Sequence, residues 1–106
     1  MTIEQRFMLP TWAVQEMSAR ATKTDRSLSW LAGAAWDAAA DEIAKRDRSV
    51  LRHTRREGFS FRDKEWVTLQ MSAEMHGLLE QHAKRFDTNL SSVLVAAWVL
   101  GSPAIA

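Results

Sequence analysis

Two stretches of this 106-residue chain carry the same residue pattern, so its fold has to be explained as a repeat. Asp25 and Trp36 recur as Asp87 and Trp98, a constant spacing of 62 residues, and a leucine, a serine and an Ala-Ala pair recur between them. A chain of this length has room for one core and not for two independent domains of ordinary size. The two copies are therefore expected to pack together as one compact domain.

Each copy opens with the pattern of a short strand. Apolar and polar residues alternate over residues 66–71, and more weakly over residues 4–9, as in a strand with one buried face. Pro10 and Ser72 are expected to end the strands, and Thr11 or Ser72 to cap the helix that follows. The side chains predicted on the outward face of the strands are Glu4, Arg6, Met8, Trp66, Thr68 and Gln70.

Two helices follow each strand. Apolar residues recur at a spacing of four over residues 11–22 and 73–86, which predicts amphipathic helices. Ser27 and Asn89 stand after polar turns and are good caps for a second helix in each copy. The second helix of the first copy is expected to continue past Trp36, because the residues that follow are strong helix formers.

The remaining segments join or follow the two copies. Residues 45–64 are rich in arginine and lysine and predict a basic linker, and residues 101–106 show no periodicity and predict a loose tail. The chain thus divides into a first unit at 1–44, the linker, a second unit at 65–100 and the tail.

The strand, helix, polar turn and second helix resemble the ribbon-helix-helix (Arc/MetJ/CopG-like) family of DNA-binding proteins. The two copies read FMLPTWAVQEMSARATKTDRSLSWLAGAAW and LQMSAEMHGLLEQHAKRFDTNLSSVLVAAW. The resemblance implies a mainly α-helical fold with one short two-stranded antiparallel ribbon. Family members dimerise because a lone strand and two helices cannot cover their apolar faces or pair the strand. With both copies on one chain, the resemblance implies a tandem pseudo-dimer that is a monomer in solution, similar to a plasmid-transfer protein of this family.

The resemblance also implies a mechanism and a partner, double-stranded DNA. A two-stranded ribbon enters the major groove, where its outward side chains read base edges. The implied base contacts are Glu4, Arg6, Met8, Trp66, Thr68 and Gln70. The first turns of the second helices are implied to hold phosphates through free amides and the helix dipole. The implied phosphate contacts are Arg26, Ser27, Leu28, Thr88, Asn89 and Leu90, with Arg55 of the linker as a further candidate whose other interpretation is a solvated charge.

The function implied is sequence-specific DNA binding by a transcriptional repressor or a plasmid-transfer accessory protein, with copies on adjacent sites left open. Glu4, Met8 and Trp66 depart from the short polar or basic residues typical of this face. The alternative is therefore a protein–protein interaction module on the same fold, antitoxin-like or an inhibitor, in which Met8 and Trp66 dock on a protein partner.

Other classes of function find no support in the sequence. The chain has no cysteine, no Gly-rich phosphate loop, no nucleophile elbow and no HExxH motif, so no enzyme and no cofactor is expected. His76, Glu80 and His82 lack a second pair of ligands at metal spacing, so no metal site is expected. No apolar stretch reaches the roughly 18 residues of a membrane span, and we expect a cytoplasmic protein that does not enter the membrane.

Overall fold

Each copy of the repeat folds into one strand followed by two helices. The computed structural model describes residues 1–54 and 62–105. The elements are β1 (Thr2–Pro10), α1 (Thr11–Thr24), α2 (Leu28–Lys45), the 3-10 helix η1 (Arg48–Thr54), β2 (Lys64–Ser72), α3 (Ala73–Arg85), α4 (Leu90–Gly101) and the 3-10 helix η2 (Ser102–Ala104). A shift of 62 residues superimposes both bounds of β1 on those of β2, and the first residues of α1 and α2 on those of α3 and α4. The protein is thus mainly helical with one two-stranded antiparallel sheet, as the sequence predicts.

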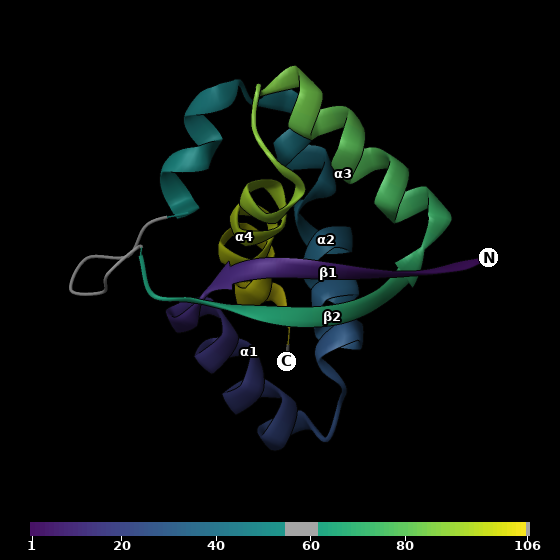
Figure 1. Cartoon of the computed structure of the whole chain (residues 1–106), viewed down its shortest axis with the longest axis vertical. Coiled ribbons are helices and arrows are strands. Elements are labelled where there is room, and N and C mark those ends of the chain that lie inside the picture. The colour runs from purple at the N-terminus through teal and green to yellow at the C-terminus, as the bar shows by residue number, and fades with distance from the viewer. Residues whose placement is uncertain (55–61, 106) are drawn as a thin grey trace.

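The two strands form an antiparallel ribbon that crosses in front of α2 and α4, with α1 below it and α3 above it (Figure 1). Thr2 pairs with Ser72 at one end. At the midpoint, Arg6 pairs with Thr68, and these two residues are also equivalent in the repeat, 62 positions apart. The centre of the pairing therefore coincides with the centre of the repeat, as expected when a local twofold axis relates the two copies.

The turns between the helices are built alike in the two copies. Asp25 and Asp87 both have positive φ, 55° and 54°, which ends the preceding helix in the left-handed conformation. Ser27 and Asn89 then cap α2 and α4 by accepting a hydrogen bond from the amide three residues ahead, as predicted. Ser72 caps α3 in the same way.

The start of α1 differs from the prediction. Thr11 is not a cap, because it is the first residue of the helix, and Pro10 occupies the cap position without a side-chain hydrogen bond. The amide of Thr11 instead donates to the carbonyl of Asp63, just before β2. The residue that precedes β2 thus accepts the hydrogen bond of the first amide of α1.

The core lies between the ribbon and the pair α2 and α4. The inward side chains of the ribbon, Phe7, Leu9, Leu69 and Met71, are buried against it. Trp36 and Trp98, at equivalent positions of α2 and α4, are each 3% exposed, which confirms that both belong to the core. At Gly101 a Cβ would overlap the backbone carbonyl of Ala35, so the absent side chain lets the two helices approach closely.

The segment between the copies is more than a basic linker. Lys45 ends α2 and Lys64 begins β2, and η1 packs on α4 between them. Val50 of η1 is fully buried, and the Arg48 Nε donates to the Phe86 carbonyl at 2.8 Å. Apolar residues inside this charged stretch therefore extend the core.

The expectation of a loose tail is wrong, because side chains of the helices hold it. Arg20 of α1 donates to the carbonyl of Ile105 at 3.0 Å, and Arg85 of α3 donates to the carbonyl of Ile43 at 2.8 Å. Ile43 and Ile105 are equivalent in the repeat. An arginine from the first helix of each copy thus donates to a carbonyl of the other copy, in the last turn of α2 for Arg85 and just after η2 for Arg20.

Within the described ranges 1–54 and 62–105, no helix has the length and apolar character that crossing a membrane requires.

Candidate nucleic-acid interface

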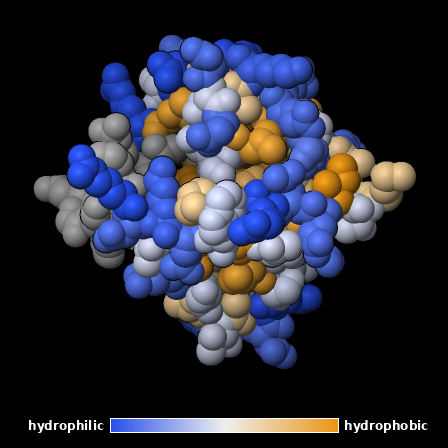
Figure 2. All heavy atoms as spheres, viewed as in Figure 1, coloured by the Kyte–Doolittle hydropathy of each residue, from blue (hydrophilic) through white to orange (hydrophobic). Residues whose placement is uncertain are grey.

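The six predicted base-contacting residues lie together on the outward face of the ribbon. The register opposes them as the pairs Glu4–Gln70, Arg6–Thr68 and Met8–Trp66. Five of them are exposed and Met8 is half-buried. In Figure 2 this face shows hydrophilic and intermediate residues across the middle, with apolar residues between the ribbon and the helices above and below. Strand alternation alone therefore identified residues that form one continuous surface.

Arg6 and Trp66 form the most specific contact on this surface. The guanidinium carbon of Arg6 lies 4.4 Å from the centroid of the Trp66 ring, a cation–π arrangement between diagonal neighbours on opposite strands. Trp66 remains 57% exposed. The stacked indole limits the orientations of the guanidinium. The N–H groups at the edge of the guanidinium stay available to an acceptor. This arrangement suits bidentate recognition of a planar pair of acceptors.

The first turns of α2 and α4 flank the ribbon. The turn before α2 lies below the ribbon and the turn before α4 lies above it (Figure 1). The Ser29 hydroxyl accepts a hydrogen bond from the Gln70 amide at 2.9 Å, which ties the start of α2 directly to β2. Because the first amides of a helix have no intrahelical acceptor, each turn presents free donors and the positive end of a helix dipole.

The predicted phosphate contacts divide into two groups by exposure. Arg26, Ser27 and Asn89 are exposed, whereas Thr88 is half-buried. Leu28 and Leu90 are half-buried and pack against the core, so only their backbone amides are suited to a phosphate. The guanidinium of Arg26 stacks over the ring of Trp30 at 4.5 Å. Arg55 lies outside the described residues.

Lys64 is a residue of this face that the sequence interpretation missed. It pairs with Pro10 at the end of the ribbon and is exposed. It has the same parity as Trp66 and Thr68, so it belongs to the outward face. The repeat is the signal that could have revealed it. A shift of 62 residues places Pro10, the last residue of β1, on Ser72, and it places Thr2, the first residue of β1, on Lys64.

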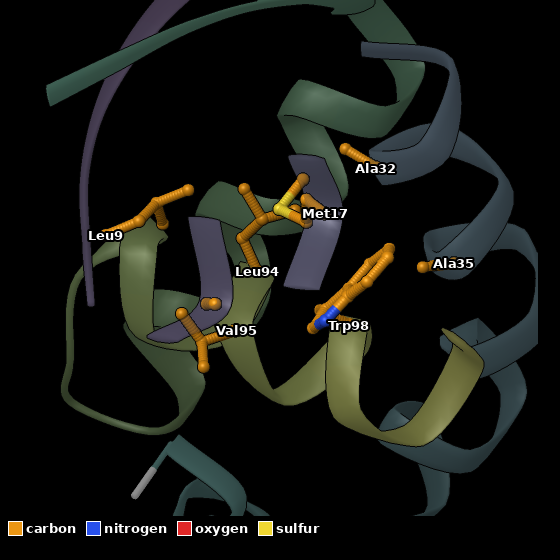
Figure 3. Close-up of a pocket in the computed structure, with 8 residues that line it drawn as sticks. Leu9, Met17, Ala32, Ala35, Leu94, Val95 and Trp98 are labelled. Carbon is orange, nitrogen blue, oxygen red and sulfur yellow. The ribbon is translucent and has the colours of Figure 1, made fainter. Parts of the chain in front are cut away.

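The described residues also enclose a small interior cavity. Leu9, Met17, Leu94 and Trp98 converge on a cavity of about 10 Å³ whose lining is entirely apolar (Figure 3). That volume is close to the minimum for one water molecule, and the lining has no polar partner to hold it. Among the described residues, no three His, Cys, Asp or Glu side chains are grouped so that they could hold a metal ion.

The chain was compared with protein-family models, curated proteins and solved structures, and none of them matches. The class of protein is therefore inferred from the repeat, the ribbon and the surface just described.

Proposed function

We propose that this protein is a single-chain ribbon-helix-helix protein that binds double-stranded DNA sequence-specifically by inserting β1 and β2 into the major groove. The observation that supports this most strongly is the set of three opposed pairs on the outward face, centred on Arg6 and Thr68. A two-stranded ribbon has the width that the major groove admits, and each base pair there presents a distinct pattern of donors and acceptors. One chain supplies both strands, so the active species is a monomer.

The outward side chains have complementary partners among the base edges. Arg6 suits the O6 and N7 acceptors of guanine, Gln70 suits the N6 and N7 of adenine, and Glu4 accepts from the N4 amino group of cytosine. Thr68 contacts several bases through its hydroxyl or methyl group, and Trp66 offers an apolar surface to a thymine methyl group. Because these side chains differ along the ribbon, its two ends recognise different bases.

Phosphate contacts supply the sequence-independent part of the affinity in this proposal. The amino-terminal turns of α2 and α4 approach the backbone on either side of the groove, with Arg26 beside one of them and Lys64 at the end of the ribbon. Each phosphate neutralised releases counterions, so binding weakens as salt concentration rises. Such binding would suit a cytoplasmic transcriptional repressor or a plasmid-transfer accessory protein, each of which acts by occupying its DNA site.

The test begins with selection of bound sequences from random duplex DNA, followed by affinity measurements at several salt concentrations. We expect a defined consensus and a negative salt slope. Arg6→Ala should lose the preference for one base pair, whereas Lys64→Ala should weaken binding to all sequences about equally, although both remove one exposed positive charge. Lys64 is the proposed phosphate contact at the end of the ribbon, so its loss removes no base contact. Recovery of no consensus, or an unchanged base preference in Arg6→Ala, would refute the proposal.

A second candidate is a protein-interaction module on the same fold, and the 57% exposure of Trp66 favours it. In that case the outward face binds a protein and the affinity for duplex DNA is weak and not sequence-dependent. Trp66→Ala would then abolish capture of the protein partner while the DNA experiments above show no consensus.

A further inference from the structure

The two copies differ where η1 packs. Figure 1 shows η1 beside α4 at the upper left, whereas the described residues that pack beside α2 in the related place are those of the short η2 and Ile105. The hydrogen bond from Arg48 to the Phe86 carbonyl locates η1 at the end of α3 and the start of the turn to α4. Phe86 is equivalent to Thr24 in the first copy. The equivalent of the η1 position is therefore the surface around Thr24 and α2.

That surface is an open groove. It has a volume of about 500 Å³ and is lined by Thr24, Arg26, Trp30, Ala34, Ala38, Ala104 and Ile105. Trp30 is 44% exposed and, like Ala34, also lines a second hollow of about 350 Å³ that reaches Gly33 and Asp37. A Cβ added at Gly33 would meet no atom within 4 Å, which shows how open this side of α2 is. We refer to the surface around Trp30, Ala34 and Ala38 as the α2 groove.

Burial of equivalent residues shows what the α2 groove lacks. Ala34 is half-buried, whereas its equivalent on α4, Ala96, is 0% exposed. Ala38 is exposed, whereas its equivalent, Leu100, is half-buried. The second copy thus has a cover on this face, to which η1 contributes its buried Val50, whereas in the first copy only Ala104 and Ile105, after α4, border the groove.

We propose that the α2 groove binds a short helical segment of a partner protein whose chemistry resembles that of η1, a branched apolar residue flanked by arginines. The internal symmetry supplies the template, because η1 presents Val50 between Arg48 and Arg52 to the related surface. Charge supports the same partner. Arg26 lines the groove before the start of α2, whereas the exposed Asp37 and Asp41 lie further along α2, so they attract the basic residues of the segment toward the carboxyl-terminal end of the helix.

The α2 groove excludes the outward face of the ribbon. Among the proposed DNA contacts it includes only Arg26, which the variants below leave unchanged. Its apolar lining gives affinity through burial, and the acidic residues of α2 select a basic partner over an acidic one. Trp30 stands at the centre of the surface, a residue type that commonly dominates binding energy in protein interfaces.

The experiment uses the full chain and, as probe, a synthetic peptide with the sequence DRSVLRHT, which copies residues 47–54. Isotope-labelled protein is titrated with the peptide while the indole N–H signals are followed by NMR, with Trp30→Phe used to assign the Trp30 signal. We expect a saturable shift at Trp30 and little change at the buried Trp36 and Trp98. A peptide carrying aspartate in place of Val50 should bind at least about tenfold more weakly.

A matched pair of variants tests the location. Ala38→Arg fills the α2 groove with a bulky positive side chain and should lower the affinity for the peptide at least about tenfold. Ala44→Arg, at a residue that is also exposed on α2 but lies outside the groove, should leave that affinity unchanged. Both variants should keep the DNA affinity of the parent, so failure here and failure of the DNA proposal are distinguishable. The proposal is overturned if the Trp30 signal does not move, if Ala38→Arg binds as well as Ala44→Arg, or if the shifts centre on Phe86 because the peptide replaces η1.

Discussion

In the proposed DNA-binding function, Arg6→Ala is expected to relax base recognition at one position of the DNA site, and the geometry of the ribbon determines the size of the effect. In a dimer of two identical chains, one substitution would alter two symmetric contacts. Here the twofold-related partner of Arg6 is Thr68, which lies directly opposite it. A single contact is removed, and a bidentate arginine–guanine contact contributes about 1 to 3 kcal/mol of discrimination. The corresponding loss of specific affinity is about fivefold to 150-fold.

The assay is fluorescence anisotropy against the selected duplex and a panel in which each base pair is replaced in turn. The parent protein should discriminate strongly at one guanine near the centre of the site, and Arg6→Ala should bind all replacements at that position about equally. Trp66→Ala provides an intermediate case, because it keeps the guanidinium and removes the ring stacked 4.4 Å from it. Two symmetric positions relaxed by Arg6→Ala, or none, would show that the ribbon does not sit on DNA as proposed.

Four further predictions concern folding and assembly. Trp98→Ala should lower the free energy of unfolding by about 3 to 5 kcal/mol in urea denaturation, since a buried ring leaves a cavity, and an unchanged midpoint would contradict its place in the core. Gly77→Ala should stabilise by up to about 1 kcal/mol because nothing lies near the added Cβ, whereas Gly101→Ala should destabilise because the methyl group meets α2, and thermal melts that rank the pair the other way would exclude the packing described. Burial, and then the nearby Arg85 guanidinium, lower the pKa of His82, so the unfolded chain binds the proton more tightly than the folded one. The stability that His82 contributes as a neutral ring is complete above the unfolded pKa of about 6.5 and is lost as pH falls from there through the lowered folded pKa. Between about pH 7.5 and about pH 5.5, the free energy of unfolding should therefore fall less in His82→Phe than in the parent. Equal decreases in the two proteins would assign the effect to other groups. Sedimentation at micromolar concentration should give a helical monomer, and a dimer that unfolds on dilution would mean that the strands pair between chains.

The fold could be predicted largely because the repeat and the strand alternation are local patterns. Once Arg6 and Thr68 are equivalent and the strands are antiparallel, a twofold axis between them determines every other pair of the ribbon. The caps Ser27 and Asn89 were likewise predictable, because the hydrogen bond that each makes reaches only three residues along the chain.

The rest depends on contacts between distant segments. Arg20 holds the tail across 85 residues of sequence, and nothing in the residues after Gly101 indicates that contact. Val50 is a single apolar residue in a strongly charged stretch, so its burial depends on the surface of α4 that receives it. In the candidate site, alternation predicted the six outward residues, but the stacking of Arg6 on Trp66 follows from the register between strands and not from either strand alone.

The ribbon also constrains how the chain reaches its folded state. Arg6 and Thr68, which pair at its centre, are 62 positions apart in the sequence. The two strands can therefore pair only when the long segment between them closes into a loop. During synthesis β1 is made first and has an unpaired edge until β2 is complete. An unpaired edge strand can pair with the same segment of a neighbouring chain. The tandem arrangement removes the need to find a second subunit, and in exchange it makes the N-terminal strand the segment most exposed to mispairing while the chain is still incomplete.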